Sequence, residues 1–160
     1  MSALSDRPNI LYIHSHDSGR YVQPYGYSVP TPNMQLLADQ GTLFRRAFCA
    51  APTCSGSRAA LLTGQHCHNN GMTGLAHRGW ELNDYGQHLV HPLKKAGYRT
   101  ILVGEQHISK DPGVIGYDEV RRLDSNLAGL VAPSALDAME IAQEPFFMSI
   151  GFFETHRDFA

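Results

Sequence analysis

The chain has 160 residues, of which 42% are hydrophobic and 18% are charged, and its formal net charge is −2 at pH 7. This length suits one modest domain, and the composition excludes a collagen, a coiled coil and a disordered chain. The nearly balanced charge argues against a general binder of nucleic acid or of an anionic membrane surface. The 9 histidines are many for this length, and histidine is common in metal binding and proton transfer.

The N-terminal segment does not read as a secretory leader or a membrane span, because His14, His16 and Asp17 interrupt its short apolar run. We therefore expect a cytoplasmic protein. A reducing compartment also fits the cysteines, which cannot all pair with one another: Cys49, Cys54 and Cys67.

Apolar runs bounded by Gly and Pro predict buried strands, and amphipathic runs with capping residues predict helices between them. The first helix has Thr31 as N-cap and Pro32 at its first position, and a later one has Ser134 as N-cap. The predicted strands are 9–15, 98–104 and 145–153. The predicted helices are 31–41, 54–64, 87–96 and 135–143.

This alternation of strands and helices indicates an α/β fold, with a mostly parallel sheet flanked by helices. Strands of such sheets are usually buried on both faces. The last predicted strand is strongly apolar, yet only a few residues follow it. We therefore expect an interrupted fold, truncated at the C-terminus, with this strand left uncovered.

Cys54 stands where a proline-containing loop gives way to a predicted helix. A helix N-terminus carries unpaired N–H groups and a positive dipole end, so it attracts anions and lowers the pKa of a thiol. Arg58 lies one turn later on the same face and can hold an oxyanion. Spacing alone leaves two interpretations of Cys54 open, a nucleophile or a buried structural thiol. For Cys49 and Cys67 the buried structural role is favoured.

The residues Cys54-Ser55-Gly56-Ser57-Arg58, followed by Leu62-Thr63-Gly64, resemble the signature of the sulfatase family. The resemblance extends along nearly the whole chain. It includes the segments 7–11, 31–38 and 68–75, of which the last is most similar to the sulfamidase (heparan N-sulfatase) branch. It implies an alkaline-phosphatase-like fold, and that residues 1–160 are the N-terminal portion of a sulfatase catalytic domain.

The resemblance also implies that Cys54 is oxidised to formylglycine by a maturation enzyme. One hydroxyl of the hydrated aldehyde then attacks the sulfur of the substrate, and the second allows the sulfated intermediate to collapse. Arg58 would be catalytic beside it. Gly56 departs from the Pro or Ser that is usual at the third position of the signature. We expect this glycine to weaken recognition by the maturation enzyme.

After the first strand the family has two adjacent aspartates that bind a divalent cation, usually calcium. This chain has His16-Asp17 there. The resemblance therefore implies His16, Asp17 and Cys54 as metal ligands, with Ca²⁺ as the expected ion. Because imidazole suits other metals better, Mn²⁺ and Zn²⁺ remain alternatives. His16 could instead be a partner of a ligand, and Asp17 a residue that caps its own loop.

Two further histidines match catalytic positions of the family, each after a predicted strand. His107 is preserved, but Glu105 replaces a lysine that contacts the sulfate, so either Glu105 points elsewhere or the substrate or metal has changed. His156, in the pair His156-Arg157, would contact the sulfate or protonate the leaving group. Ligands of open α/β sheets gather at the carboxyl ends of strands, where we expect Asp17, Cys54, His107 and His156 to converge. The other histidines are expected to be structural or at the surface: His14, His66, His68, His77, His88 and His91.

We therefore expect a hydrolase of sulfate esters or N-sulfates that acts on a small-molecule or saccharide substrate. The departures at His16 and Glu105 keep a metal-dependent phosphomonoesterase or phosphodiesterase of the same superfamily as an alternative. An inactive truncated fragment is a third, because the family's second pair of metal ligands would lie beyond residue 160.

Overall fold

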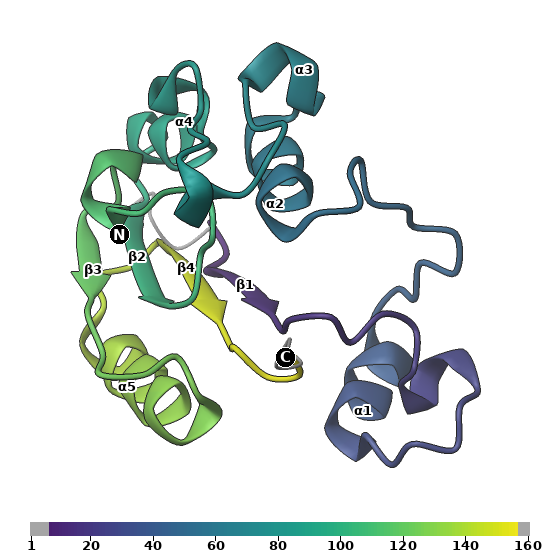
Figure 1. The fold of residues 1–160 in the computed structure, drawn as a ribbon. Coiled ribbons are helices and arrows are strands. Elements are labelled where there is room, and N and C mark those ends of the chain that lie inside the picture. Colours follow the sequence, from purple (N-terminus) through teal and green to yellow (C-terminus); the bar gives the residue numbers. More distant parts are fainter. Residues whose placement is uncertain (1–6, 157–160) are drawn as a thin grey trace.

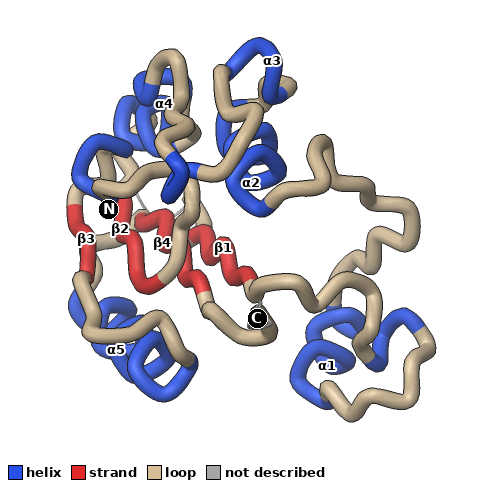
Figure 2. Tube along the Cα trace, viewed as in Figure 1, coloured by secondary structure: helices blue, strands red, loops and turns tan. Residues whose placement is uncertain are grey.

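The centre of the computed structural model, which describes residues 7–156, is a four-stranded parallel sheet (Figures 1 and 2). The strands run in the order β1-β4-β2-β3. The predicted α/β fold with a parallel sheet is confirmed, and so are its three predicted strands. The fourth strand, β3, escaped prediction because it is three residues long and charged at both ends. The bounds are Ile10–His14 for β1, Arg99–Gly104 for β2, Glu119–Arg121 for β3 and Phe146–Gly151 for β4.

The last strand in the chain is not the last in the sheet. β4 lies between β1 and β2, and all six of its residues are buried. Its side chains alternate between two cores, Phe147 on one face and Met148 and Ile150 on the other. The expectation that this strand is left uncovered is therefore wrong, because helices earlier in the chain already cover both of its faces.

Helices pack on both faces of the sheet (Figure 1). On one face, Ala59 and Leu62 of α2 and Val90 of α4 share a core with Phe147. On the other face, the core of α5 and the sheet consists of Val131, Ala135 and Ala138 with Ile101, Val103, Phe146, Met148 and Ile150. The helices are α1 (Pro32–Gln40), α2 (Cys54–Thr63), α3 (Cys67–Asn70), α4 (Val90–Lys95) and α5 (Ala128–Ile141).

Two of the predicted helices have different bounds in the structure. The predicted helix 87–96 is divided into a short 3-10 turn and α4. The helix predicted at 135–143 begins earlier, at Ala128, so Ser134 lies inside it rather than at its N-cap. Pro133 caused this error, because proline usually ends a helix, whereas here it lies within the helix. The 3-10 turns are Gln23–Tyr25, Ala76–Arg78, Tyr85–Gln87 and Pro112–Ile115.

The region from β1 to α2 is the least buried part of the structure. α1 has no buried residue, and its N-cap residue Thr31 makes no capping bond, since its hydroxyl accepts from the Gln23 N–H instead. On β1, the outer strand, Leu11 and Ile13 are 44% and 56% exposed. Within residues 7–156, none of the helices has the length and apolar character needed to cross a membrane.

Candidate active site

Three neighbouring strands end side by side at one edge of the sheet. His14 of β1 and Gly104 of β2 are both in register with Gly151 of β4. Because the strands are parallel, the loops that follow them leave from the same edge (Figure 1). These loops carry the polar residues that the sequence singles out, namely His16, Asp17, Glu105, His107 and His156.

Backbone hydrogen bonds extend beyond the strand ends and hold these loops together. The His16 N–H donates to the Glu154 carbonyl over 2.8 Å, and the Thr155 N–H donates to the His16 carbonyl over 2.9 Å. The Glu105 N–H donates to the Gly151 carbonyl over 2.9 Å. The segments after β1, β2 and β4 are therefore fixed relative to one another before any side chain is considered.

Cys54 is the first residue of α2, and Arg58 lies one turn further on. Both line a cavity of about 350 Å³, together with His14, His16 and Asp17. The structure therefore places the thiol at a helix N-terminus with the guanidinium in the same cleft, as expected. A sulfate or phosphate group in this cavity would meet the N–H groups of the helix and a fixed cation.

The Arg58 guanidinium is held against the end of β1. It contacts both ring nitrogens of His14 and donates to the Ser15 carbonyl over 3.4 Å. Burial, followed by Arg58 and then His16, lowers the pKa of His14 to about 3, so this imidazole is neutral at pH 7. A neutral ring can accept a bond from the guanidinium and keep it in place. His14 therefore has a structural role, as expected, but it fills that role as the support of Arg58 inside the cavity, a placement that the sequence did not reveal. Strand alternation could have found it, because Tyr12 and His14 share a face of β1.

A second group of imidazoles centres on His16, which is 1% exposed. Its Nε2 lies 3.1 Å from Nδ1 of His107, and its ring centroid lies 4.8 Å from that of His156. Burial is the largest cause that lowers the pKa of both His16 and His107. His77, which the sequence leaves as structural or at the surface, lies with its ring centroid 5.8 Å from that of His107. Arg157, the neighbour of His156 in the sequence pair, lies outside the described residues.

Glu105 turns its carboxylate onto the backbone of its own loop. Oε1 accepts the N–H groups of Gln106 and His107 over 2.9 Å and 3.1 Å, and Oε2 accepts from the Asn126 amide over 3.0 Å. These bonds hold His107 at a φ of 58°, in the left-handed region that residues other than glycine rarely adopt. Of the two possibilities left open by the sequence, the structure supports the first. Glu105 is not among the residues that line the cavity of Cys54, and its carboxylate orders the loop that carries His107.

Gly56 and Cys67 pack against each other behind Cys54. A side chain at Gly56 would lie 3.1 Å from the Met72 carbonyl and from the Ala51 methyl, so the packing favours glycine here. The buried Cys67 donates its thiol to the Gly56 carbonyl, which confirms its structural role. Cys49 does not fit that prediction, because it is exposed and lines the same cavity as Cys54.

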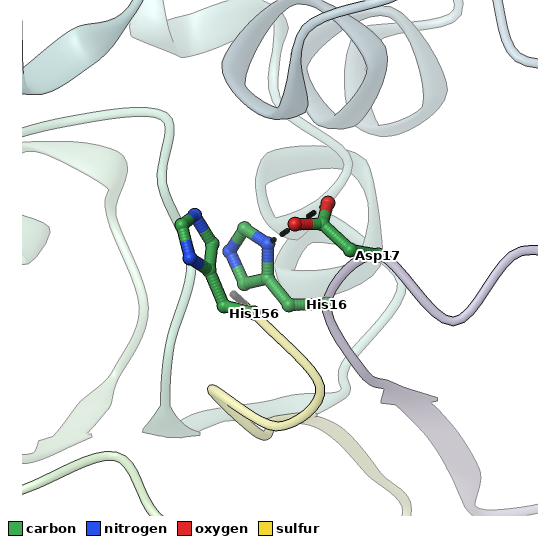
Figure 3. A group of neighbouring side chains, drawn as sticks. All are labelled: His16, Asp17 and His156. Carbon is green, nitrogen blue, oxygen red and sulfur yellow. Dashed lines mark ion pairs between the residues drawn. The ribbon is translucent and has the colours of Figure 1, made fainter. Parts of the chain in front are cut away.

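Asp17 lies at the mouth of the site, with its side chain 47% exposed and a φ of 51°. Its Oδ1 is 3.7 Å from His16 Nδ1, and one donor atom each from His16, Asp17 and His156 lie within 4.8 Å of one another (Figure 3). The predicted ligand set was His16, Asp17 and Cys54. In the described structure the first two line the same cavity as Cys54, but their donor atoms group with one of His156 rather than with the Cys54 thiol.

Comparison with solved structures supports the fold. A structure of a 2-O GAG sulfatase superposes with a TM-score of 0.72 at 23% sequence identity, covering 94% of this chain and 36% of that one. At this identity the likeness concerns the fold alone, and it agrees with the alkaline-phosphatase-like architecture that the resemblance implies.

Sequence comparison identifies the family. The human N-sulphoglucosamine sulphohydrolase is 32% identical over 93% of this chain, and an N-acetylglucosamine-6-O-sulfatase of Bacteroides thetaiotaomicron is 32% identical over 66% of it. The chain spans 32% of the length of the human relative and 19% of the bacterial one. The family model described as Sulfatase matches residues 8–160. The chain therefore belongs to the sulfatase family.

Proposed function

We infer that the protein hydrolyses sulfate esters or N-sulfates of saccharides, with Cys54 as the precursor of the nucleophile. The observation that carries this proposal is the position of Cys54 at the N-terminus of α2, with Arg58 one turn on in the same cavity. The names of its relatives add the substrate class, because those described above are enzymes of sulfated glucosamines.

The residues of the cavity have complementary roles in this proposal. The N–H groups at the start of α2 and the Arg58 guanidinium bind the sulfate oxygens, as helix N-termini and arginines do elsewhere. His14 keeps that guanidinium in place. A maturation enzyme converts Cys54 to formylglycine, whose hydrated form supplies one hydroxyl to attack sulfur and a second to release it.

Three histidines beside the cavity contact the substrate or one another in this proposal: His16, His107 and His156. His107, whose pKa burial lowers, rests in its neutral form, so one ring nitrogen can accept from His16 while the N–H of the other contacts a sulfate oxygen. His156 donates a ring N–H to a sulfate oxygen, a role that one nitrogen can fill while the other binds an ion. His16 contacts both of these rings. Its Nε2 lies 3.1 Å from Nδ1 of His107, and its ring lies against that of His156, so it fixes their positions relative to each other.

Calcium, the ion that the resemblance implies, does not fit the described donor set. Ca²⁺ takes six to eight oxygen ligands in proteins. The group near the cavity offers one carboxylate, from Asp17, and two imidazoles, from His16 and His156. No step of the proposed reaction is therefore assigned to calcium.

The phosphoesterase alternative loses one of the two observations that support it. These observations are the presence of His16 at a metal-binding position and of Glu105 where the family has a lysine that contacts the sulfate. Because Glu105 is bonded to backbone N–H groups of its own loop and does not line the cavity of Cys54, its carboxylate does not occupy the place of a sulfate-binding cation there. His16 remains as a departure, and it concerns the metal rather than the ester.

The test uses the protein encoded by the complete open reading frame, purified after expression with a formylglycine-generating enzyme. Mass spectrometry of the peptide that contains Cys54 should show the aldehyde. Release of sulfate from N-sulfated and O-sulfated glucosamine should exceed release of phosphate from the matching phosphate ester. Faster phosphate release with an unmodified Cys54 thiol would support the phosphoesterase instead.

Glu105 offers a separate prediction about the loop after β2. Glu105→Gln keeps an oxygen acceptor but loses the charge, so its bonds to the loop weaken, and stability should fall by about 1 kcal/mol. Because Glu105 raises the pKa of His107, removal of its charge should shift the acid limb of the pH–rate profile to lower pH. Glu105→Lys, which restores the residue usual in the family, should be less active than Glu105→Gln because it removes the acceptor altogether.

A matched control is Glu81→Lys, which makes the same charge change on an exposed loop. It should leave the pH–rate profile in place. If Glu105→Lys were more active than the original protein, Glu105 would be a defect in sulfate binding rather than a support for His107.

A further inference from the structure

We propose that His16, Asp17 and His156 form a binding site for a divalent ion that prefers nitrogen ligands, of which Zn²⁺ is the first candidate. The proposal deepens the proposed function, because the ion would bind at the same edge of the sheet. The role of the ion rests on that function. It departs from calcium because two of the three donors are imidazoles.

The spacing of the donor atoms fits a shared ion better than a direct bond. His16 Nδ1 and Asp17 Oδ1 are 3.7 Å apart, which is too long for a hydrogen bond (Figure 3). Two ligand atoms that share a zinc ion, each at roughly 2.0–2.2 Å from it, lie about 3 to 4 Å apart. His156 completes the group within 4.8 Å, so a small inward movement of its ring would bring a third donor to the ion.

The other nitrogen of His16 has the partner that a metal-binding histidine needs. Histidine ligands usually hold the second ring nitrogen in a hydrogen bond, which fixes the tautomer and the orientation of the ring. Nε2 of His16 lies 3.1 Å from Nδ1 of His107. When His16 donates through this contact, its Nδ1 carries a lone pair that faces Asp17, as binding of an ion requires.

The backbone fixes the site in advance. The His16 N–H and carbonyl pair with Glu154 and Thr155, just before His156 in the chain. The His156 ring also stacks on Phe153, with ring centroids 4.8 Å apart and an interplanar angle of 15°. His16 is 1% exposed, so one ligand is buried while Asp17 faces the solvent, from which an ion can enter. Ligands from the loops that follow β1 and β4 thus meet without a large rearrangement.

Calorimetric titration of the chelator-stripped protein with Zn²⁺, Mn²⁺ and Ca²⁺ in turn tests this site without turnover. We expect one equivalent of Zn²⁺ to bind, more tightly than Mn²⁺, and about 100-fold or more tightly than Ca²⁺. His16→Asp should reduce that preference at least tenfold, and His156→Gln should weaken Zn²⁺ by more than the roughly 10-fold that loss of a ligand's partner costs. His68→Ala, at an exposed histidine of α3, is the matched control and should bind Zn²⁺ unchanged.

Circular dichroism of each variant shows whether it is folded, and visible absorption of bound Co²⁺ reports nitrogen ligation independently. Tighter binding of Ca²⁺ than of Zn²⁺, or Zn²⁺ affinity that survives both His16→Asp and His156→Gln in folded protein, would overturn the proposal. Zinc binding without sulfate release would instead leave the metal site standing and count against the proposed function.

Discussion

Replacement of Cys54 by alanine is expected to abolish sulfate release, with a loss of roughly 10³-fold or more. The reason is covalent chemistry. The aldehyde made from Cys54 supplies the attacking oxygen, and alanine leaves neither a thiol to mature nor a hydroxyl to attack. Helix N–H groups and Arg58 remain in Cys54→Ala, so the substrate should still bind. The loss should therefore appear in kcat rather than in KM.

Two further variants test whether activity depends on the formylglycine made from Cys54 rather than on any thiol in the cavity. Cys49→Ala removes the exposed thiol at the wall of the same cavity, and its activity should stay within about twofold. Cys54→Ser keeps one hydroxyl but lacks the second, so it should stop after a single attack. Mass spectrometry should then find sulfate on Ser at position 54. Full activity of Cys54→Ala would rule out the mechanism, and the phosphoesterase would survive only with a different nucleophile.

The sequence predicted those parts of the fold that depend on local patterns. The strands near 9–15, 98–104 and 145–153 are short apolar runs between turn residues, and the start of α2 at Cys54 follows from the loop before it. The order of the strands was not predictable in this way. Insertion of β4 between β1 and β2 depends on contacts across more than a hundred residues, and it decides which strand is covered.

In the candidate site, too, the sequence predicted local contacts but not contacts between distant residues. Cys54 and Arg58 are one helical turn apart, so spacing alone brings them together. The contact of Arg58 with His14 joins residues 44 positions apart, and the bond from Asn126 to Glu105 joins residues 21 apart. Strand alternation indicates the face of β1 on which His14 lies, but no spacing in the sequence predicts either contact. As a result, the support for Arg58 went unpredicted, and the role of Glu105 stayed open.

Gly104 gives a prediction that ties the stability of the sheet to the geometry of the site. It ends β2 with a φ of +80°, a conformation that costs a residue with a side chain about 1–2 kcal/mol. A methyl group there would overlap the Gly151 carbonyl and lie 2.9 Å from Val131 Cγ2, between β4 and α5. That carbonyl accepts the Glu105 N–H, so it cannot move aside without loosening the loop that carries His107.

Gly104→Ala should therefore lower the free energy of unfolding by about 3 kcal/mol or more, the sum of strained backbone and overpacking. Gly129→Ala is the matched control, because Gly129 lies in α5 and, apart from its chain neighbours and the backbone of its own helix, no atom lies within 4 Å of the added methyl. It should raise stability by about 0.5–1 kcal/mol, since alanine favours a helix more than glycine does. Urea denaturation of both variants measures the two effects with opposite signs. Unchanged stability of Gly104→Ala would mean that β2 and β4 do not end in contact, and the loops that carry His107 and His156 would then lack their common anchor.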